Sequence, residues 1–124
     1  MKFYNANPLD KRTGDCVYRA LSFFLGITWI KAVFELVIYA TNRGMVNFNY
    51  VSNITGYLAD KNFVRKKPKK NTTVNLFIQQ YAKTGKCYLL AIERPKHLTI
   101  IDSEKELVDT WNCSDKFVKY YWER

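Results

Sequence analysis

Long apolar runs are missing from this chain of 124 residues. A helix needs about 20 consecutive apolar residues to cross a bilayer, and the longest apolar run here, 33–40, is interrupted by Glu35. The first five residues also contain no apolar signal core. We therefore expect a cytoplasmic protein with no membrane partner.

Glycine, proline, cysteine and histidine are also scarce. The 5 glycines and 3 prolines exclude a fibrous or low-complexity chain, and the 48% hydrophobic content is enough for the core of one domain, residues 1–124. The 3 cysteines are an odd number without an export signal, which favours reduced thiols over a disulfide framework. Because His97 is the only histidine, any imidazole base must be His97.

Acidic residues are few compared with basic ones, 11 against 20, so the net charge is +9. Such an excess favours acidic partners, either protein surfaces or nucleic acids. No nucleic-acid-binding motif is visible, so nucleic acid is the weaker of these predictions. The densest basic run surrounds Pro68 and is interpreted either as a solvated connector or as a patch that docks a partner. It comprises Arg65, Lys66, Lys67, Lys69 and Lys70.

The apolar pattern changes halfway along the chain. Helical spacing predicts four helices in the first half, over 16–25, 29–42, 51–61 and 74–83. Alternating and short apolar runs predict four strands in the second half, over 87–92, 97–101, 107–111 and 117–122. This order predicts an α+β fold, with a helical part at about 13–84 and an antiparallel sheet at about 85–122.

Cys16 follows Gly14 and Asp15 and begins the first predicted helix. A helix N-terminus presents unpaired backbone N–H groups and about half a positive charge, and both favour a thiolate. The carboxylate of Asp15 acts in the opposite direction. Position alone therefore leaves two interpretations, a nucleophilic cysteine or a small residue packed in the first helical turn.

His97 and Asp109 lie on consecutive predicted strands. An antiparallel neighbour can bring the Asp109 carboxylate beside one ring nitrogen of His97, which fixes the tautomer and stabilises the imidazolium. Together with Cys16 they have the logic of a catalytic triad. Asn112 is an alternative orienting residue.

Three cysteines and one histidine also form, by number, a zinc ligand set. However, the spacing of Cys16, Cys87, His97 and Cys113 contains no C-x-x-C pair. We expect no metal and no cofactor, and we interpret Cys87 and Cys113 as packing residues.

Several segments resemble one family in the same order along the chain. Residues 13–21 (TGDCVYRAL) resemble the GDC-x-x-RA segment of small papain-like cysteine peptidase superfamily proteins, which phages and bacterial mobile elements encode. Residues 84–90 resemble the strand before the family's histidine, and 97–101 resemble the histidine strand. Residues 109–114 (DTWNCS) resemble the family's DTWD/N segment, and 118–122 fit its closing strand.

The resemblance implies a papain-like fold in which helices carrying Cys16 pack on a sheet carrying His97 and Asp109. It implies thiol chemistry on an acyl group of a protein or peptide substrate, by hydrolysis, deamidation or transfer. Papain-like enzymes place a glutamine in the oxyanion hole, but no glutamine precedes Cys16, so Asn7 is the predicted amide. The alternative is a weakly active or inactive papain-like fold that acts as a basic binding module, such as an inhibitor of an acidic host protein in the host cytoplasm.

Overall fold

The computed structural model describes residues 1–12, 14–45 and 51–124. The described chain is α+β, as the sequence predicted, with four helices and a five-stranded sheet. The helices are α1 (Cys16–Leu25), α2 (Trp29–Thr41), α3 (Val51–Asp60) and α4 (Val74–Gln80). The strands are β1 (Lys2–Phe3), β2 (Tyr88–Ile92), β3 (His97–Ile101), β4 (Leu107–Asp109) and β5 (Val118–Glu123).

The sheet is mixed rather than wholly antiparallel. Its strand order is β1-β4-β3-β2-β5, and the pair β1–β4 is parallel. The last strand, β5, returns to pair with β2, so β2 lies in the interior of the sheet. The two-residue strand β1, which lies outside the predicted sheet region, covers the free edge of β4, where Phe3 is the partner of Asp109.

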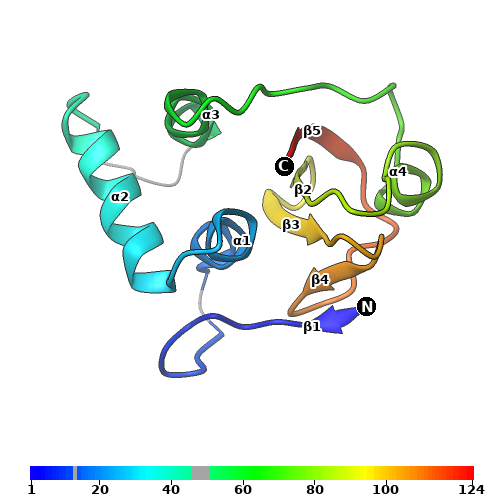
Figure 1. Cartoon of the computed structure of the whole chain (residues 1–124), viewed down its shortest axis with the longest axis horizontal. Helices are drawn as coiled ribbons and strands as arrows, with labels where there is room; N and C mark the ends of the chain where they lie inside the picture. Colours follow the sequence, from blue (N-terminus) through cyan, green and yellow to red (C-terminus); the bar gives the residue numbers. More distant parts are fainter. Residues whose placement is uncertain (13, 46–50) are drawn as a thin grey trace.

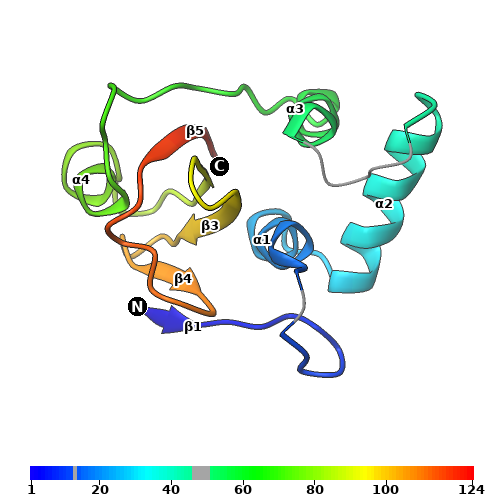
Figure 2. The ribbon, with the colours of Figure 1, turned by 180° about the vertical axis from the view of Figure 1, so that it is seen from behind.

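Helices cover both faces of the sheet. Figures 1 and 2 show α1 between the sheet and α2, with α4 on the opposite side of the strands. On the α1 side, Phe24 of the helix shares a core with Leu89, Ile100 and Trp122 of the strands. On the α4 side, Phe77 packs in a second core with neighbouring strand residues such as Tyr88. This cover explains why every residue of β2 is buried, because alternation of buried and exposed residues requires one solvated face.

The predicted ends of α1 and α2 are largely confirmed. Gly26 adopts the left-handed conformation at the end of α1, and the Thr28 side chain accepts the N–H of Lys31 at 3.1 Å. Helix α4 ends three residues earlier than predicted, because the carbonyl of Phe77 accepts the N–H groups of both Tyr81 and Ala82 and closes the last turn. Thr13, the first residue of the cysteine motif, lies outside the described residues.

No single described helix is long and apolar enough to span a bilayer. Helices α1 and α2 would satisfy this test only as a pair, by length and composition, and they are bent by 106° at the break between them.

Candidate active site

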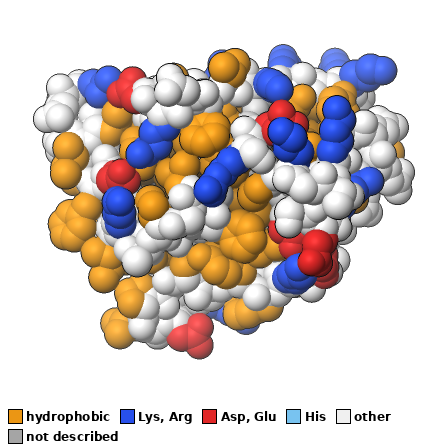
Figure 3. Space-filling view, in the orientation of Figure 1, with side chains coloured by type: hydrophobic (Ala, Val, Ile, Leu, Met, Phe, Trp, Pro, Cys, Tyr) orange, Lys and Arg blue, Asp and Glu red, His pale blue; other side chains and the backbone are white. Residues whose placement is uncertain are grey.

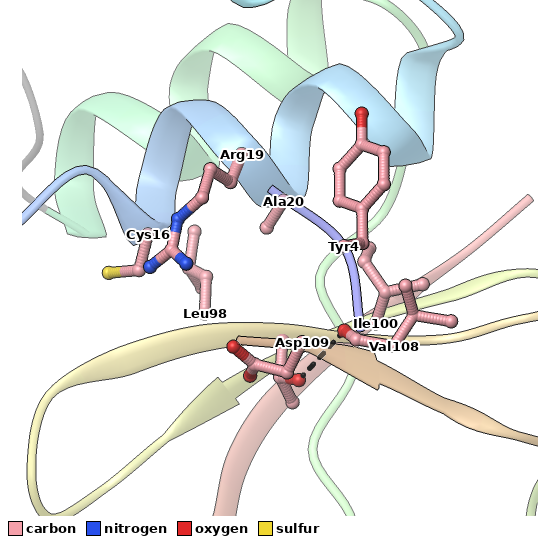
Figure 4. A pocket seen from close by; sticks show the side chains of 9 residues that line it. Tyr4, Cys16, Arg19, Ala20, Leu98, Ile100, Val108 and Asp109 are labelled. Atoms are coloured by element: carbon pink, nitrogen blue, oxygen red, sulfur yellow. Dashed lines mark hydrogen bonds between the residues drawn. The ribbon is translucent and has the colours of Figure 1, made fainter. Parts of the chain in front are cut away.

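Cys16 is the first residue of α1, and the helix packs across the strand that begins with His97. Figure 4 shows Cys16, Arg19 and Ala20 on the face of α1 that looks toward the strands carrying Leu98 and Asp109. The burial of Ala20, Leu21 and Phe24 fixes this rotation of the helix, because their apolar surfaces face the sheet. The packing of α1 therefore holds the thiol of Cys16 beside the sheet.

His97 is the first residue of β3 and is hydrogen-bonded to Asp109, the last residue of β4. The distance between His97 Nε2 and Asp109 Oδ2 is 2.6 Å. Ile100 pairs with Val108 in the antiparallel ladder, and if this register is continued, Asp109 lies opposite Thr99. Residues two apart on a strand share a face, so His97 and Thr99 lie on the same face and the carboxylate reaches His97 diagonally.

The Asp109 carboxylate is buried and held from several sides. Its Oδ1 accepts the backbone N–H of Thr110 at 2.6 Å, and the thiol of Cys113 lies 3.7 Å from its Oδ2. Burial raises the pKa of Asp109, but the hydrogen bonds from His97 and Thr99 and the charge of His97 outweigh that effect and lower it. The carboxylate therefore stays ionised beside the imidazole.

The thiol of Cys16 and the imidazole of His97 line the same groove and interact electrostatically. Because Nε2 is taken by Asp109, Nδ1 is the ring nitrogen left for the thiol. Burial raises the pKa of Cys16, but the bonds from His97 and the backbone of Leu98 and the charges of His97 and Arg19 lower it overall. Burial lowers the pKa of His97, whereas Asp109 and Cys16 raise it, to about 9. Each of the two groups therefore favours the charged form of the other.

The environments of the other two cysteines raise the pKa of their thiols. Burial raises the pKa of Cys87 to about 11. Burial and the charge of Asp109 raise the pKa of Cys113 to about 12. Only Cys16, among the three thiols, is placed to react near neutral pH.

The sequence left open whether Arg19 is exposed or pairs with an acidic residue, and the structure shows that it is buried and paired. Its Nε lies 3.1 Å from Asp15 Oδ1, and its Nη1 donates to Thr110 Oγ1 at 2.6 Å. Thr110 directly follows Asp109, so this arginine links the start of α1 to the strand end that orients His97. The four-residue spacing of Asp15 and Arg19 is the feature of the sequence that permits this ion pair, because residues four apart lie on one helix face.

Asp15 precedes α1 but does not cap it. Its carboxylate instead accepts the indole N–H of Trp29 at 2.8 Å and pairs with Arg19. The N–H groups of Cys16 and Val17 have no intrahelical partner, and no hydrogen bond between described residues uses them. These groups point along the positive end of the helix, so they can stabilise an oxyanion formed at Cys16.

Asn7, the predicted oxyanion amide, lies in the N-terminal loop. Its Nδ2 donates to Asp15 Oδ2 at 3.3 Å, and its Oδ1 accepts the N–H of Leu9 at 2.9 Å. It does not line the groove described below. Its contribution to an oxyanion hole stays a prediction.

Asn112, the alternative orienting residue, is exposed, and its Oδ1 accepts the N–H of Ser114 at 3.0 Å. Asp109 therefore occupies the position beside His97.

The ring of Trp111 also contacts His97, with its centroid 5.0 Å from that of the imidazole. This contact restricts rotation of the imidazole.

Two cavities reach Cys16, and they differ greatly in size. The one between α1 and the sheet, drawn in Figure 4, measures about 10 Å³, the volume of about one water molecule. The other is a groove of about 370 Å³ lined by both Cys16 and His97. Of these two cavities between described residues, the groove is the one large enough to admit a ligand.

His97, Asp109 and Cys113 lie close enough to form a possible metal-ligand group. However, the ring nitrogen and the carboxylate oxygen are already 2.6 Å apart, which is a hydrogen-bond distance. Two ligands each about 2 Å from one tetrahedral zinc ion stand farther apart than this. The cluster is therefore explained as a hydrogen-bonded unit.

No protein-family model, curated protein or solved structure matches this chain. The chemistry of the site must therefore be inferred from its own geometry.

Proposed function

We propose that the protein is a small papain-like cysteine hydrolase or acyltransferase. The observation that carries the proposal is that Cys16 lines one groove with His97, which is hydrogen-bonded to Asp109, so that one helix and two strands bring the three residues together. The helix that carries Cys16 packs on the sheet that carries His97 and Asp109. A papain-like fold would have the same arrangement, which supports the proposal. The lowered pKa of Cys16 supports the same function.

In the first half of the reaction, the Cys16 thiolate attacks an acyl carbon, and a new S–C bond forms while the carbonyl electron pair moves to oxygen. The N–H groups at the start of α1 stabilise this oxyanion. The intermediate then collapses, and the bond to the leaving group breaks as His97 Nδ1 gives that group its proton. The product of this half is a thioester on Cys16 and a neutral imidazole.

In the second half, His97 removes a proton from water or from an acceptor amine, which attacks the thioester carbon. Collapse of this intermediate breaks the S–C bond and restores the thiolate and the imidazolium. Water gives hydrolysis, and an amine gives transfer. Asp109 holds the ring in place and stabilises its charged form throughout.

Selective alkylation tests this proposal directly. Iodoacetamide at pH 6 is expected to label Cys16 far faster than Cys87 or Cys113, because only Cys16 has a lowered pKa. Mass spectrometry of the digested protein measures the three rates. The variant His97→Ala is expected to remove the preference. Equal and slow labelling of all three thiols in the native protein would contradict the proposal.

A second candidate function is that of a basic binding module for an acidic protein. The net charge of +9 and the exposed positions of the basic side chains in 65–70 favour it. The two functions are separated by the variant Cys16→Ala in an assay of biological activity. Retained activity supports binding, whereas lost activity supports the thiol chemistry.

A further inference from the structure

The groove that contains Cys16 and His97 has an apolar floor and a positively charged rim. Val17, Ile54 and Leu98 contribute apolar side chains to its lining. Lys96 and Lys119 are exposed on the rim, and Glu93 is the only acidic residue among the lining residues. No ion pair between described residues engages either lysine. The ammonium group of Lys119 lies 5.5 Å from the centre of the Tyr120 ring, and neither lysine is neutralised by a carboxylate among the described residues.

The positive charge continues beyond the groove along β5. Tyr120 of β5 lines the groove, and the guanidinium of Arg65 lies 3.9 Å from the centre of its ring. The connector between α3 and α4 then runs beside β5, since the backbones of Lys66 and Tyr121 exchange two hydrogen bonds of 2.8 and 2.9 Å. The groove rim and the basic run are therefore neighbours in the fold.

The basic run itself is largely open to solvent. Lys66 forms an ion pair with Glu123 at 3.7 Å, while Lys67, Lys69 and Lys70 have no ion-pair partner within the described ranges. Figure 3 shows blue side chains gathered at the upper right, over the connector between α3 and α4. A basic track, defined as Lys96, Lys119, Arg65 and the lysines of 66–70, thus extends from the groove rim to this connector.

We propose that the acyl substrate of Cys16 is part of an acidic polypeptide. A carboxylate close to the reacting acyl group faces Lys96 and Lys119, and further acidic residues lie along the basic track. This inference rests on the proposed thiol chemistry. That chemistry requires an acyl carbon, which a polypeptide offers and a phosphodiester backbone lacks, so the site favours an acidic peptide over a nucleic acid. The apolar floor is also suited to a peptide side chain.

Two matched peptide probes test the charge preference. Both are acetylated tripeptides ending in a vinyl sulfone, and they differ only by glutamate or glutamine beside the electrophile. The thiolate adds to the vinyl carbon and a proton goes to the neighbouring carbon, so labelling of Cys16 can be followed by mass spectrometry. We expect the glutamate probe to react about 5-fold faster at low salt, as partly exposed charge pairs allow. Added salt should reduce the difference.

Charge-removing variants connect the preference to the groove. Lys96→Gln and Lys119→Gln are each expected to lower the ratio of the two rates. Lys86→Gln is the matched control, because Lys86 is equally charged and exposed but precedes the opposite end of β2. In Lys86→Gln, the ratio of the labelling rates of the two probes should equal that of the native protein.

The outcomes separate this inference from the function on which it rests. Equal rates for the two probes, with Cys16 still labelled selectively by iodoacetamide, would overturn the acidic-peptide inference alone. Unselective labelling by iodoacetamide would instead overturn the thiol chemistry. Protection of Cys16 by an oligothymidylate but not by polyglutamate would assign the track to nucleic acid and refute the peptide.

Discussion

Replacing Asp109 by asparagine should lower the pKa of His97 by a large and measurable amount. The native pKa is raised from 6.5 to about 9, although burial acts in the opposite direction. The hydrogen bond that His97 donates to Asp109 is the first of the effects that raise it, followed by the interaction with Cys16. Without the carboxylate, the pKa should fall back toward 6.5 or lower, because desolvation of the imidazolium is then poorly compensated.

The raised pKa of His97 also contributes to the free energy of unfolding. A rise from 6.5 to about 9 corresponds to roughly 3 kcal/mol in favour of the charged imidazole. Because the folded-state pKa of His97 lies above the unfolded one, this stabilisation is fully present below about pH 6.5 and is lost as the pH rises through about 9. The substitution Asp109→Asn should therefore cost more unfolding free energy at pH 6 than at pH 10, with roughly 3 kcal/mol as the largest expected difference.

Proton NMR can follow this titration directly, because the chain has one histidine and only one set of imidazole signals. We expect a midpoint near 9 for the native protein and a much lower one for Asp109→Asn. Asp102→Asn is the control, since Asp102 is a comparably buried aspartate that bonds Lys2. A native midpoint near 6.5, or a midpoint unchanged in Asp109→Asn, would refute the reasoning.

Two further substitutions test the framework of the site by urea denaturation. Arg19→Met leaves the buried carboxylate of Asp15 without its ion-pair partner and should cost about 3–5 kcal/mol; the double variant with Asp15→Asn should recover part of that loss, and an unchanged midpoint for the single variant would contradict this. Thr28→Ala removes the side-chain cap of α2 and should cost about 1 kcal/mol, whereas Thr28→Ser keeps the cap. Equal losses for alanine and serine would contradict the role of the cap.

The elements that position the thiol could be predicted because local chemistry determines them. Gly26 supplies the left-handed residue that ends α1, so the predicted helix 16–25 is confirmed. The predicted strand 97–101 is also confirmed, because a run of apolar and β-branched residues follows His97. Aspartate is a favoured residue at the start of a helix, but Asp15 does not cap α1 with its side chain, because the indole of Trp29 and the Arg19 side chain occupy its carboxylate. The contact with Trp29 does not follow from the sequence around Asp15, whereas the four-residue spacing to Arg19 permits the other one.

The choice between Asp109 and Asn112 could not be made from the sequence. It depends on the register between β3 and β4, and the turn that joins them sets this register. Lys105 adopts a positive φ of 63° in that turn, a conformation that lysine rarely takes. The Asp102 carboxylate holds the turn by accepting the N–H groups of Glu104 and Glu106. The two-residue strand β1 was missed for a related reason, because two residues carry no periodicity.

The first residues of the chain join the two layers of the site, although none of them faces the groove. The N–H of Tyr4 donates to the carbonyl of Asp109 at 3.0 Å, and its hydroxyl lies 3.1 Å from Oγ of Ser22 on α1. Tyr4 therefore connects the end of β4, which carries Asp109, to α1, which carries Cys16. The spacing between Cys16 and the pair His97–Asp109 is thus tied to a segment that lies outside the groove.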